Sequence, residues 1–100
     1  MIIETEKYYI PNKRRVILLP IAWREEFNID VEDHVLIGLN ENEIIISPDS
    51  VLETEFAKPA KVYKKGELTI PKSIDEQLEP KPHQLLVDPV NKCFYLSPVN

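Results

Sequence analysis

Short apolar runs, separated by polar and turn-forming residues, are the main pattern along this chain. Runs of three or four residues that are rich in β-branched and large apolar side chains are typical of short strands. They fall at residues 16–19, 35–37, 44–46, 68–70, 85–87 and 94–96. The pattern therefore predicts a mainly β structure.

Two segments break the strand pattern and carry apolar residues at helical spacing. Trp23 and Phe27 stand four residues apart, as do Ile74 and Leu78, and each pair begins three residues after a proline. Side chains four apart share one face of a helix. A proline suits the first turn of a helix, because a missing N–H costs little there. We expect two short helices.

The same order of elements occurs twice. Pro20 and Pro71 stand 51 residues apart, and the run 35–37 lies 50 residues before the run 85–87. Such self-similarity predicts two copies of a strand, strand, helix, strand, strand unit, at residues 1–50 and 51–100. A unit this small buries too little apolar surface to be stable alone. Either the copies pair within one chain as a pseudo-dimer, or each pairs with a copy from another chain in a homo-oligomer.

Composition narrows the classes of function. The chain has 100 residues, of which 43% are hydrophobic and 29% charged, a globular balance. It has only two glycines and none of the Gly-rich strings that cradle phosphates. The apolar runs are too short to span a bilayer and no signal-peptide pattern follows Met1, so we expect a soluble, cytoplasmic protein without a membrane partner.

Charge is distributed unevenly along this acidic chain. The formal net charge of −5 argues mildly against a nucleic-acid partner. However, residues 7–24 contain five basic residues and no acid, and residues 58–72 contain five lysines opposed only by Glu67. These two windows are either phosphate-binding surfaces or solvated turns whose lysines only aid solubility.

The second window leads into a string that resembles a known family. Lys-Gly-Glu-Leu-Thr-Ile-Pro-Lys-Ser-Ile at residues 65–74 is similar to the opening of the AbrB/MazE/SpoVT DNA-binding unit. That unit runs from a Lys-Gly turn through a strand ending in Ile-Pro to a short helix, followed by two strands. Residues 14–48 resemble it more loosely, and two copies in one chain is the arrangement of MraZ-like proteins.

The resemblance implies a swapped-hairpin β-barrel, in which two units interleave their strands. It also implies that basic residues around the first hairpin and the helix start of each unit contact duplex DNA, without a cofactor. Carried over residue by residue, these DNA-binding residues are Lys13, Arg14, Arg15 and Arg24 in the first copy and Lys61, Lys64, Lys65 and Lys72 in the second.

Two positions depart from the family pattern. Glu67 stands where family members commonly have arginine or glutamine, and Asp75 replaces the arginine that the first copy keeps as Arg24. A carboxylate near a DNA phosphate repels it. Because every arginine of the chain lies in the first copy, we expect an asymmetric protein in which these arginines make the specific contacts.

Other reactive side chains are better explained as structure. His34 and His83 have no second ligand at metal-binding spacing and are expected at the surface or in loops. Cys93 is expected to be a buried strand thiol, and the acidic pairs 25–26 and 75–76 are expected on exposed helix faces. We therefore expect no catalytic residue, no metal site and no enzymatic activity.

The sequence thus predicts a DNA-binding transcriptional regulator. One alternative is an antitoxin of the same family that binds a toxin-like protein. Another is an interaction protein, borne by a phage or mobile element, that keeps the fold but binds DNA weakly or not at all. The net charge, Glu67 and Asp75 favour these protein-binding alternatives.

Overall fold

The computed structural model describes residues 1–48, 54 and 56–99. In chain order the elements are β1 (Ile3–Tyr9), β2 (Val16–Leu18), α1 (Ile21–Glu26), β3 (His34–Asn40), β4 (Glu43–Ser47), β5 (Phe56–Lys61), the 3-10 turn η1 (Lys64–Gly66), β6 (Glu67–Thr69), α2 (Lys72–Asp75), β7 (His83–Asp88) and β8 (Cys93–Pro98). Each predicted strand run overlaps one of these strands. The prediction of a mainly β structure with two short helices is confirmed.

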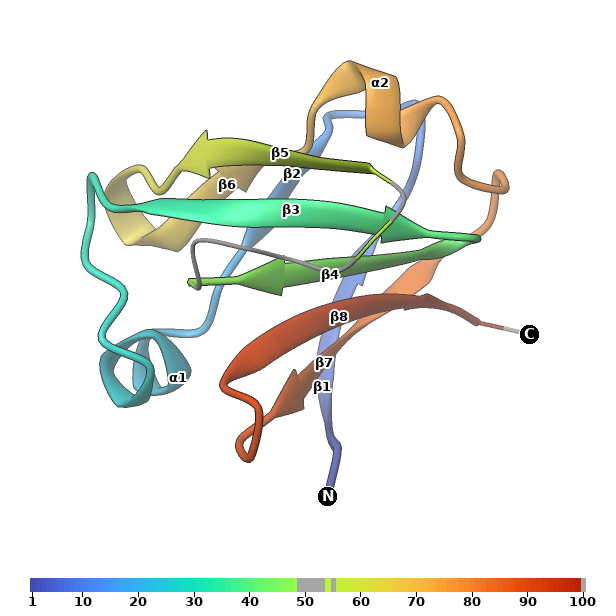
Figure 1. Cartoon of the computed structure of the whole chain (residues 1–100). Coiled ribbons are helices and arrows are strands. Elements are labelled where there is room, and N and C mark those ends of the chain that lie inside the picture. The colour runs from blue at the N-terminus through green and yellow to red at the C-terminus, as the bar shows by residue number, and fades with distance from the viewer. Residues whose placement is uncertain (49–53, 55, 100) are drawn as a thin grey trace.

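Six strands form one antiparallel sheet in the order β1-β7-β8-β4-β3-β5, and β2 pairs with β6 in a separate two-stranded ribbon (Figure 1). The first strand of each half pairs with the third strand of the other half, β1 with β7 and β5 with β3. β1 and β5 are edges, so the pairing among the described strands does not close the barrel that the resemblance implies. The predicted boundary between residues 50 and 51 lies outside the described residues.

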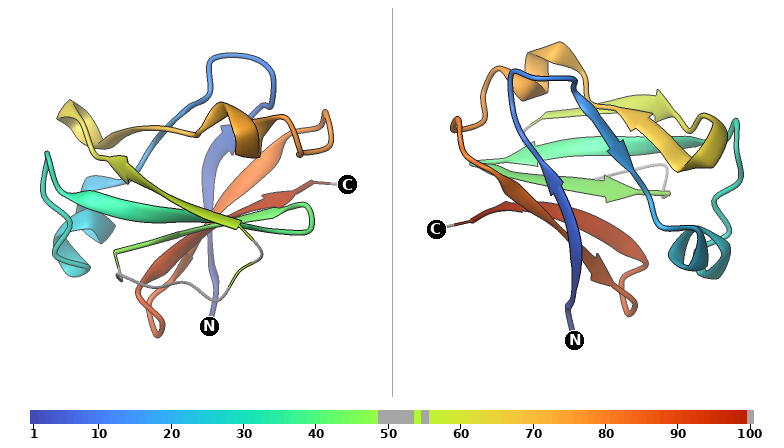
Figure 2. Two further views of the ribbon diagram at one scale, coloured as in Figure 1. Left: turned by 45° about the horizontal axis from the view of Figure 1, so that its top comes forward. Right: turned by 180° about the vertical axis from the view of Figure 1, so that it is seen from behind.

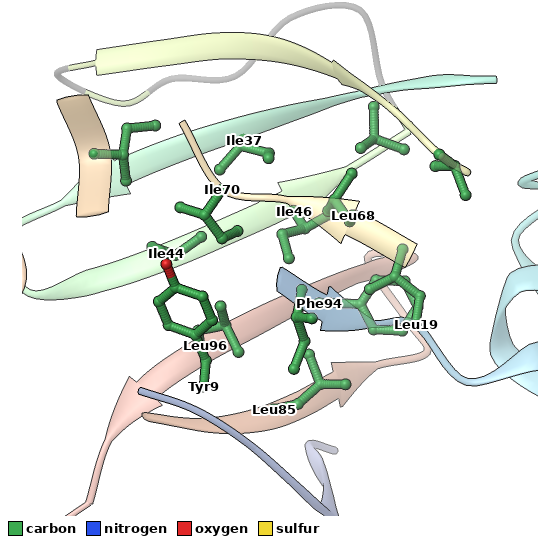
Figure 3. Close-up of a cluster of buried hydrophobic side chains, with 14 of the residues drawn as sticks. Tyr9, Leu19, Ile37, Ile44, Ile46, Leu68, Ile70, Leu85, Phe94 and Leu96 are labelled. Carbon is green, nitrogen blue, oxygen red and sulfur yellow. The ribbon is translucent and has the colours of Figure 1, made fainter. Parts of the chain in front are cut away.

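The β2–β6 ribbon lies across the inner face of the curved sheet (Figure 2). Buried side chains of both the ribbon and the sheet form one hydrophobic core. Alternate residues of β3, β4, β7 and β8 are buried, as expected for strands with one face in a core. Figure 3 shows Leu68 and Ile70 of the β6 segment in one cluster with Ile46 and Phe94 of the sheet. Tyr9, at the end of β1, is buried in the same cluster.

Both helices begin directly after a proline. Pro20 and Pro71 have extended backbone, with ψ of 135° and 140°, and stand one position before the first helical residue rather than within the first turn. The fixed φ of proline favours this change of direction from strand to helix. Phe27 and Ile74 anchor the helices in the core, and Trp23 packs on Phe27 with ring centroids 5.8 Å apart.

Candidate nucleic-acid interface

The β2–β6 ribbon turns one side to the core and the other to solvent. Its central pair, Ile17 and Leu68, is buried. The pairs on either side give the outer face, which consists of the side chains of Val16, Leu18, Glu67 and Thr69. Leu18 is 40% exposed, and Glu67 and Thr69 are exposed. This outer face is the part of the ribbon that another molecule can reach.

Backbone hydrogen bonds close both ends of the ribbon. The amide of Ile70 donates to the carbonyl of Arg15 at 2.7 Å, and the amide of Leu19 donates to the carbonyl of Gly66 at 3.0 Å. Because the two strands are antiparallel, the turn before each strand lies beside the residues that follow the other strand. The turns that contain most of the basic residues of the two windows are therefore held at opposite ends of one ribbon.

The first basic turn, residues 10–15, is joined by Lys72 from α2. Lys13, Arg15 and Lys72 line a hollow of about 190 Å³, together with Asn12, Asp75 and Glu76. Arg14 lines another hollow of about 310 Å³, whose other walls include Leu18 and Glu67 of the outer face. Lys13 and Arg14 are exposed. The structure thus brings together four of the predicted DNA-binding residues at one end of the ribbon.

The second basic turn, residues 61–66, lies at the other end. Lys64 and Lys65 are exposed there. Lys61 is partly engaged by its neighbours, because its Nζ lies 3.5 Å from a carboxylate oxygen of Glu32 and 5.6 Å from the ring centroid of Tyr63. Such an exposed ion pair contributes little to stability and leaves the ammonium accessible.

Arg24 lies apart from both groups, in the interior. Its side chain is buried, with 8% of the residue exposed, and its Nε donates a hydrogen bond to the carbonyl of Leu19 at 2.9 Å. It also fills the space beside Gly66, where a Cβ would stand 2.4 Å from Nε. In this geometry Arg24 stabilises the end of the ribbon at Leu19 and Gly66. The resemblance instead implies that Arg24 contacts DNA.

Asp75 corrects the expectation that residues 75–76 lie on an exposed helix face. Asp75 is buried, with 2% of the residue exposed, whereas Glu76 is exposed. Its Oδ1 accepts a hydrogen bond from the hydroxyl of Tyr9 at 2.5 Å, and its Oδ2 accepts one from the amide of Asn12 at 3.1 Å. Burial, followed by the hydrogen bond to Asp75, raises the pKa of the Tyr9 phenol far above its usual value. The hydroxyl therefore stays protonated and donates to the carboxylate.

Tyr9 and Asn12 support the site but are not among the DNA-binding residues that the sequence predicts. Tyr9 stands next to the exposed Tyr8, and no periodicity distinguishes the buried tyrosine from the exposed one. Asn12 carries a weak signal, because asparagine is favoured among non-glycine residues in left-handed backbone, and its φ is 63°. Both connect the first basic turn to α2.

The remaining candidates add no chemistry to the site. His83 is fully buried at the start of β7, which corrects its expected place at the surface or in a loop, while His34 is exposed. Cys93 is buried in β8, as expected.

Among the described residues, no group of histidine, cysteine and acidic side chains is arranged to hold a metal ion. Within the same residues, each helix is too short or too polar to cross a membrane.

Comparison with known proteins gave no match to a family model, to a curated protein or to a solved structure.

Proposed function

We propose that this protein is a transcriptional regulator of the AbrB/SpoVT type that binds duplex DNA with the outer face and the two basic turns of the β2–β6 ribbon. The observation that carries the proposal is the position of Lys13, Arg14 and Lys72 at one end of an exposed ribbon and of Lys64 and Lys65 at the other. The exchange of first strands between the halves supports the swapped-hairpin arrangement of two repeats as an intrachain pseudo-dimer.

The dimensions of the ribbon suit a DNA groove. Four residue steps separate the hydrogen-bonded ends at Arg15 and Leu19, and at about 3.3 Å per residue they span about 13 Å. The major groove of B-DNA is about 12 Å wide and admits a two-stranded β-ribbon. A ribbon lying across the groove presents one basic turn to each flanking phosphate backbone. Side chains of the outer face then approach the base edges.

The two ends of the ribbon differ in chemistry. The first basic turn carries two arginines, whose planar guanidinium groups can bind guanine or phosphate through two hydrogen bonds. The second carries lysines, which act as point charges, and Lys61 is shared with Glu32. We assign the specific contacts to Arg14 and Arg15 and phosphate contacts to the lysines, while Arg24 supports the ribbon from within.

Fluorescence anisotropy tests this function. The purified protein is titrated into a labelled duplex from upstream of its own gene and into a scrambled duplex, each at two salt concentrations. A basic ribbon on an acidic protein should bind the first duplex preferentially, and the affinity should fall steeply with salt, because each neutralised phosphate contributes about −0.9 to the logarithmic slope. A folded sample that binds neither duplex at low salt contradicts the proposal.

The double substitution Arg14→Ala and Arg15→Ala tests the assignment of the site. We expect binding to weaken by about 1–3 kcal/mol for each lost base contact. Lys92→Ala is the matched control, because Lys92 is exposed and has a φ of 55°, the same as Arg15, but lies in the β7–β8 turn. That turn lies at the opposite end of the molecule from α2 (Figure 2). Equal affinities for the folded double variant and the control would remove the arginines from the site.

A protein-binding function is the second candidate, and the outer face itself favours it. Leu18 on the ribbon and Ile21 at the start of α1 are exposed apolar side chains. Glu67 places a carboxylate between the two basic turns. An exposed apolar surface with an acidic centre suits a partner protein with a basic, partly apolar face. A partner that copurifies with the wild-type chain and is lost with Leu18→Asp, while neither duplex binds, would favour this function.

A further inference from the structure

The helix α2 contributes a buried carboxylate to the turn that carries the arginines. Both oxygens of Asp75 face the first half of the chain: the hydroxyl of Tyr9 donates to Oδ1, and the amide of Asn12 lies 3.1 Å from Oδ2 and 3.3 Å from Oδ1. Tyr9 is the last residue of β1, and Asn12 lies within the first basic turn. A single side chain thus ties α2 to both the start and the middle of that turn.

The first basic turn needs such support for two reasons. Asn12 and Arg15 have φ values of 63° and 55°, a left-handed backbone that costs free energy for residues other than glycine. In addition, Lys13, Arg14 and Arg15 are consecutive cations with Lys72 close by, and like charges repel one another in the absence of DNA. A buried carboxylate opposes that repulsion and accepts the amide hydrogen of Asn12.

The corresponding residue of the other half supports its ribbon end differently. Arg24 stands 51 residues before Asp75, is also buried, and donates to the carbonyl of Leu19 while it packs on Gly66. One helix therefore stabilises the second basic turn with a cation, and the other stabilises the first basic turn with an anion. The replacement of arginine by aspartate at this position makes the two ends of the ribbon chemically distinct.

We propose that Asp75 is a positioning residue that sets the conformation of the first basic turn through Tyr9 and Asn12 and so presents Lys13 and Arg14 to DNA. The expected effect on DNA binding rests on the proposed function. The effect of Asp75 on the conformation of the first basic turn does not depend on DNA. Asp75, one of the two departures from the family pattern, acts behind the binding surface, where its charge favours the arginine turn.

The proposal and simple electrostatics predict opposite results for removal of one negative charge. In Asp75→Asn the amide side chain keeps an acceptor for Asn12, but the charge and the strong hydrogen bond from Tyr9 are lost. In Glu76→Gln, the matched control, the same charge is removed from the exposed neighbour on the same helix, which lies 3.9 Å from Lys72. Less negative charge near phosphate should strengthen DNA binding by both variants if charge alone matters.

We expect Glu76→Gln to bind duplex DNA as well as the wild type or better, and Asp75→Asn to bind about tenfold more weakly, the effect of one charged hydrogen bond. The salt dependence of Asp75→Asn should also become shallower by about 0.9 for each phosphate contact that is lost. Tyr9→Phe removes only the hydroxyl and should weaken binding in the same direction. Tighter binding by Asp75→Asn, as by Glu76→Gln, would overturn the proposal.

Amide hydrogen exchange tests the same proposal without DNA. The amide of Asn12 should exchange about tenfold faster in Asp75→Asn and Tyr9→Phe than in the wild type, beyond any acceleration at the core amide of Ile46, which reports the change in global stability. Unchanged exchange at Asn12 in both variants would contradict the positioning role. If the wild type binds no duplex but Asn12 responds as expected, the proposed function fails and the structural role of Asp75 remains.

Discussion

Two buried charged residues, Arg24 and Asp75, lie where the two halves meet. Arg24 and Asp75 lie in short helices with few residues to bury, yet each is less than 10% exposed and is hydrogen-bonded at one end of the ribbon. A buried charge without hydrogen-bond partners costs free energy. Each of these side chains therefore favours the one local conformation in which its partners are in place. Substitutions at these contacts should therefore act on stability as well as on binding.

Gly66 and Lys65 provide a pair of substitutions with opposite expected effects. Gly66 has a φ of 79°, and a Cβ there would stand 2.6 Å from the carbonyl oxygen of Leu19, so Gly66→Ala should lower the free energy of unfolding by about 2 kcal/mol or more. Lys65 has a φ of 65°, and Lys65→Gly relieves left-handed strain, with a gain of up to about 1 kcal/mol. Urea denaturation measures both, and equal stabilities would contradict the strained turn.

Tyr9 predicts the pH dependence of stability on the alkaline side. Its pKa is raised in the folded protein by burial and by Asp75, while the unfolded chain releases the phenolic proton near pH 10. Tyr9 therefore makes its full contribution to the free energy of unfolding below pH 10. This contribution is lost as the pH rises above 10. Above pH 10, the free energy of unfolding should fall less steeply with pH in Tyr9→Phe than in the wild type. The difference in slope corresponds to up to about one proton released on unfolding. Part of the slope should remain, because a hydrogen bond with Cys93 and burial also raise the pKa of Tyr95. An identical slope in the variant would contradict a protonated, buried Tyr9.

At the scale of elements, the ribbon separates residues by face with a two-residue period. Leu68 faces the core and is fully buried, whereas Leu18 belongs to the outer face. Leu68→Ala should therefore cost about 2–5 kcal/mol of stability, and Leu18→Ala less than about 0.5 kcal/mol. Thermal or urea denaturation distinguishes the two. Similar losses for both leucines would mean that the ribbon has no exposed outer face.

The sequence predicts these elements better than it predicts their contacts. Apolar runs and proline spacing indicate both helices and the strands β2, β3, β4, β6, β7 and β8, because burial of one face imposes a period on the chain. The fate of a single charged side chain depends on partners far away in sequence, which a local pattern does not contain. The sequence therefore predicts an exposed Asp75, whereas the structure buries it through hydrogen bonds with Tyr9 and Asn12. Likewise, the basic windows could be found in the sequence, but their place at opposite ends of one ribbon could not.

At the scale of the whole molecule, the two halves share one sheet and one core. Four strand pairings cross between the halves, β1 with β7, β5 with β3, β4 with β8 and β2 with β6, and join them by main-chain hydrogen bonds. The repeat spacing predicts that the halves pair, but it does not distinguish pairing within a chain from pairing between chains. The strand order provides both partners within one chain. Neither half can then lose its packing without exposing a strand edge of the other.

This shared core predicts that the protein unfolds as one cooperative unit. Leu96 in β8 is buried opposite Ile44 in β4, so Leu96→Ala should remove about 2–5 kcal/mol from the second half. If the halves unfold together, the slowest-exchanging amides of β3 in the first half, such as that of Ile37, should lose the same protection free energy. Val90→Ala, in the exposed β7–β8 turn, serves as the control and should change neither. The interleaved pairing leaves no route by which one half could unfold alone, so retained protection at Ile37 in Leu96→Ala would contradict this prediction and show two independent units.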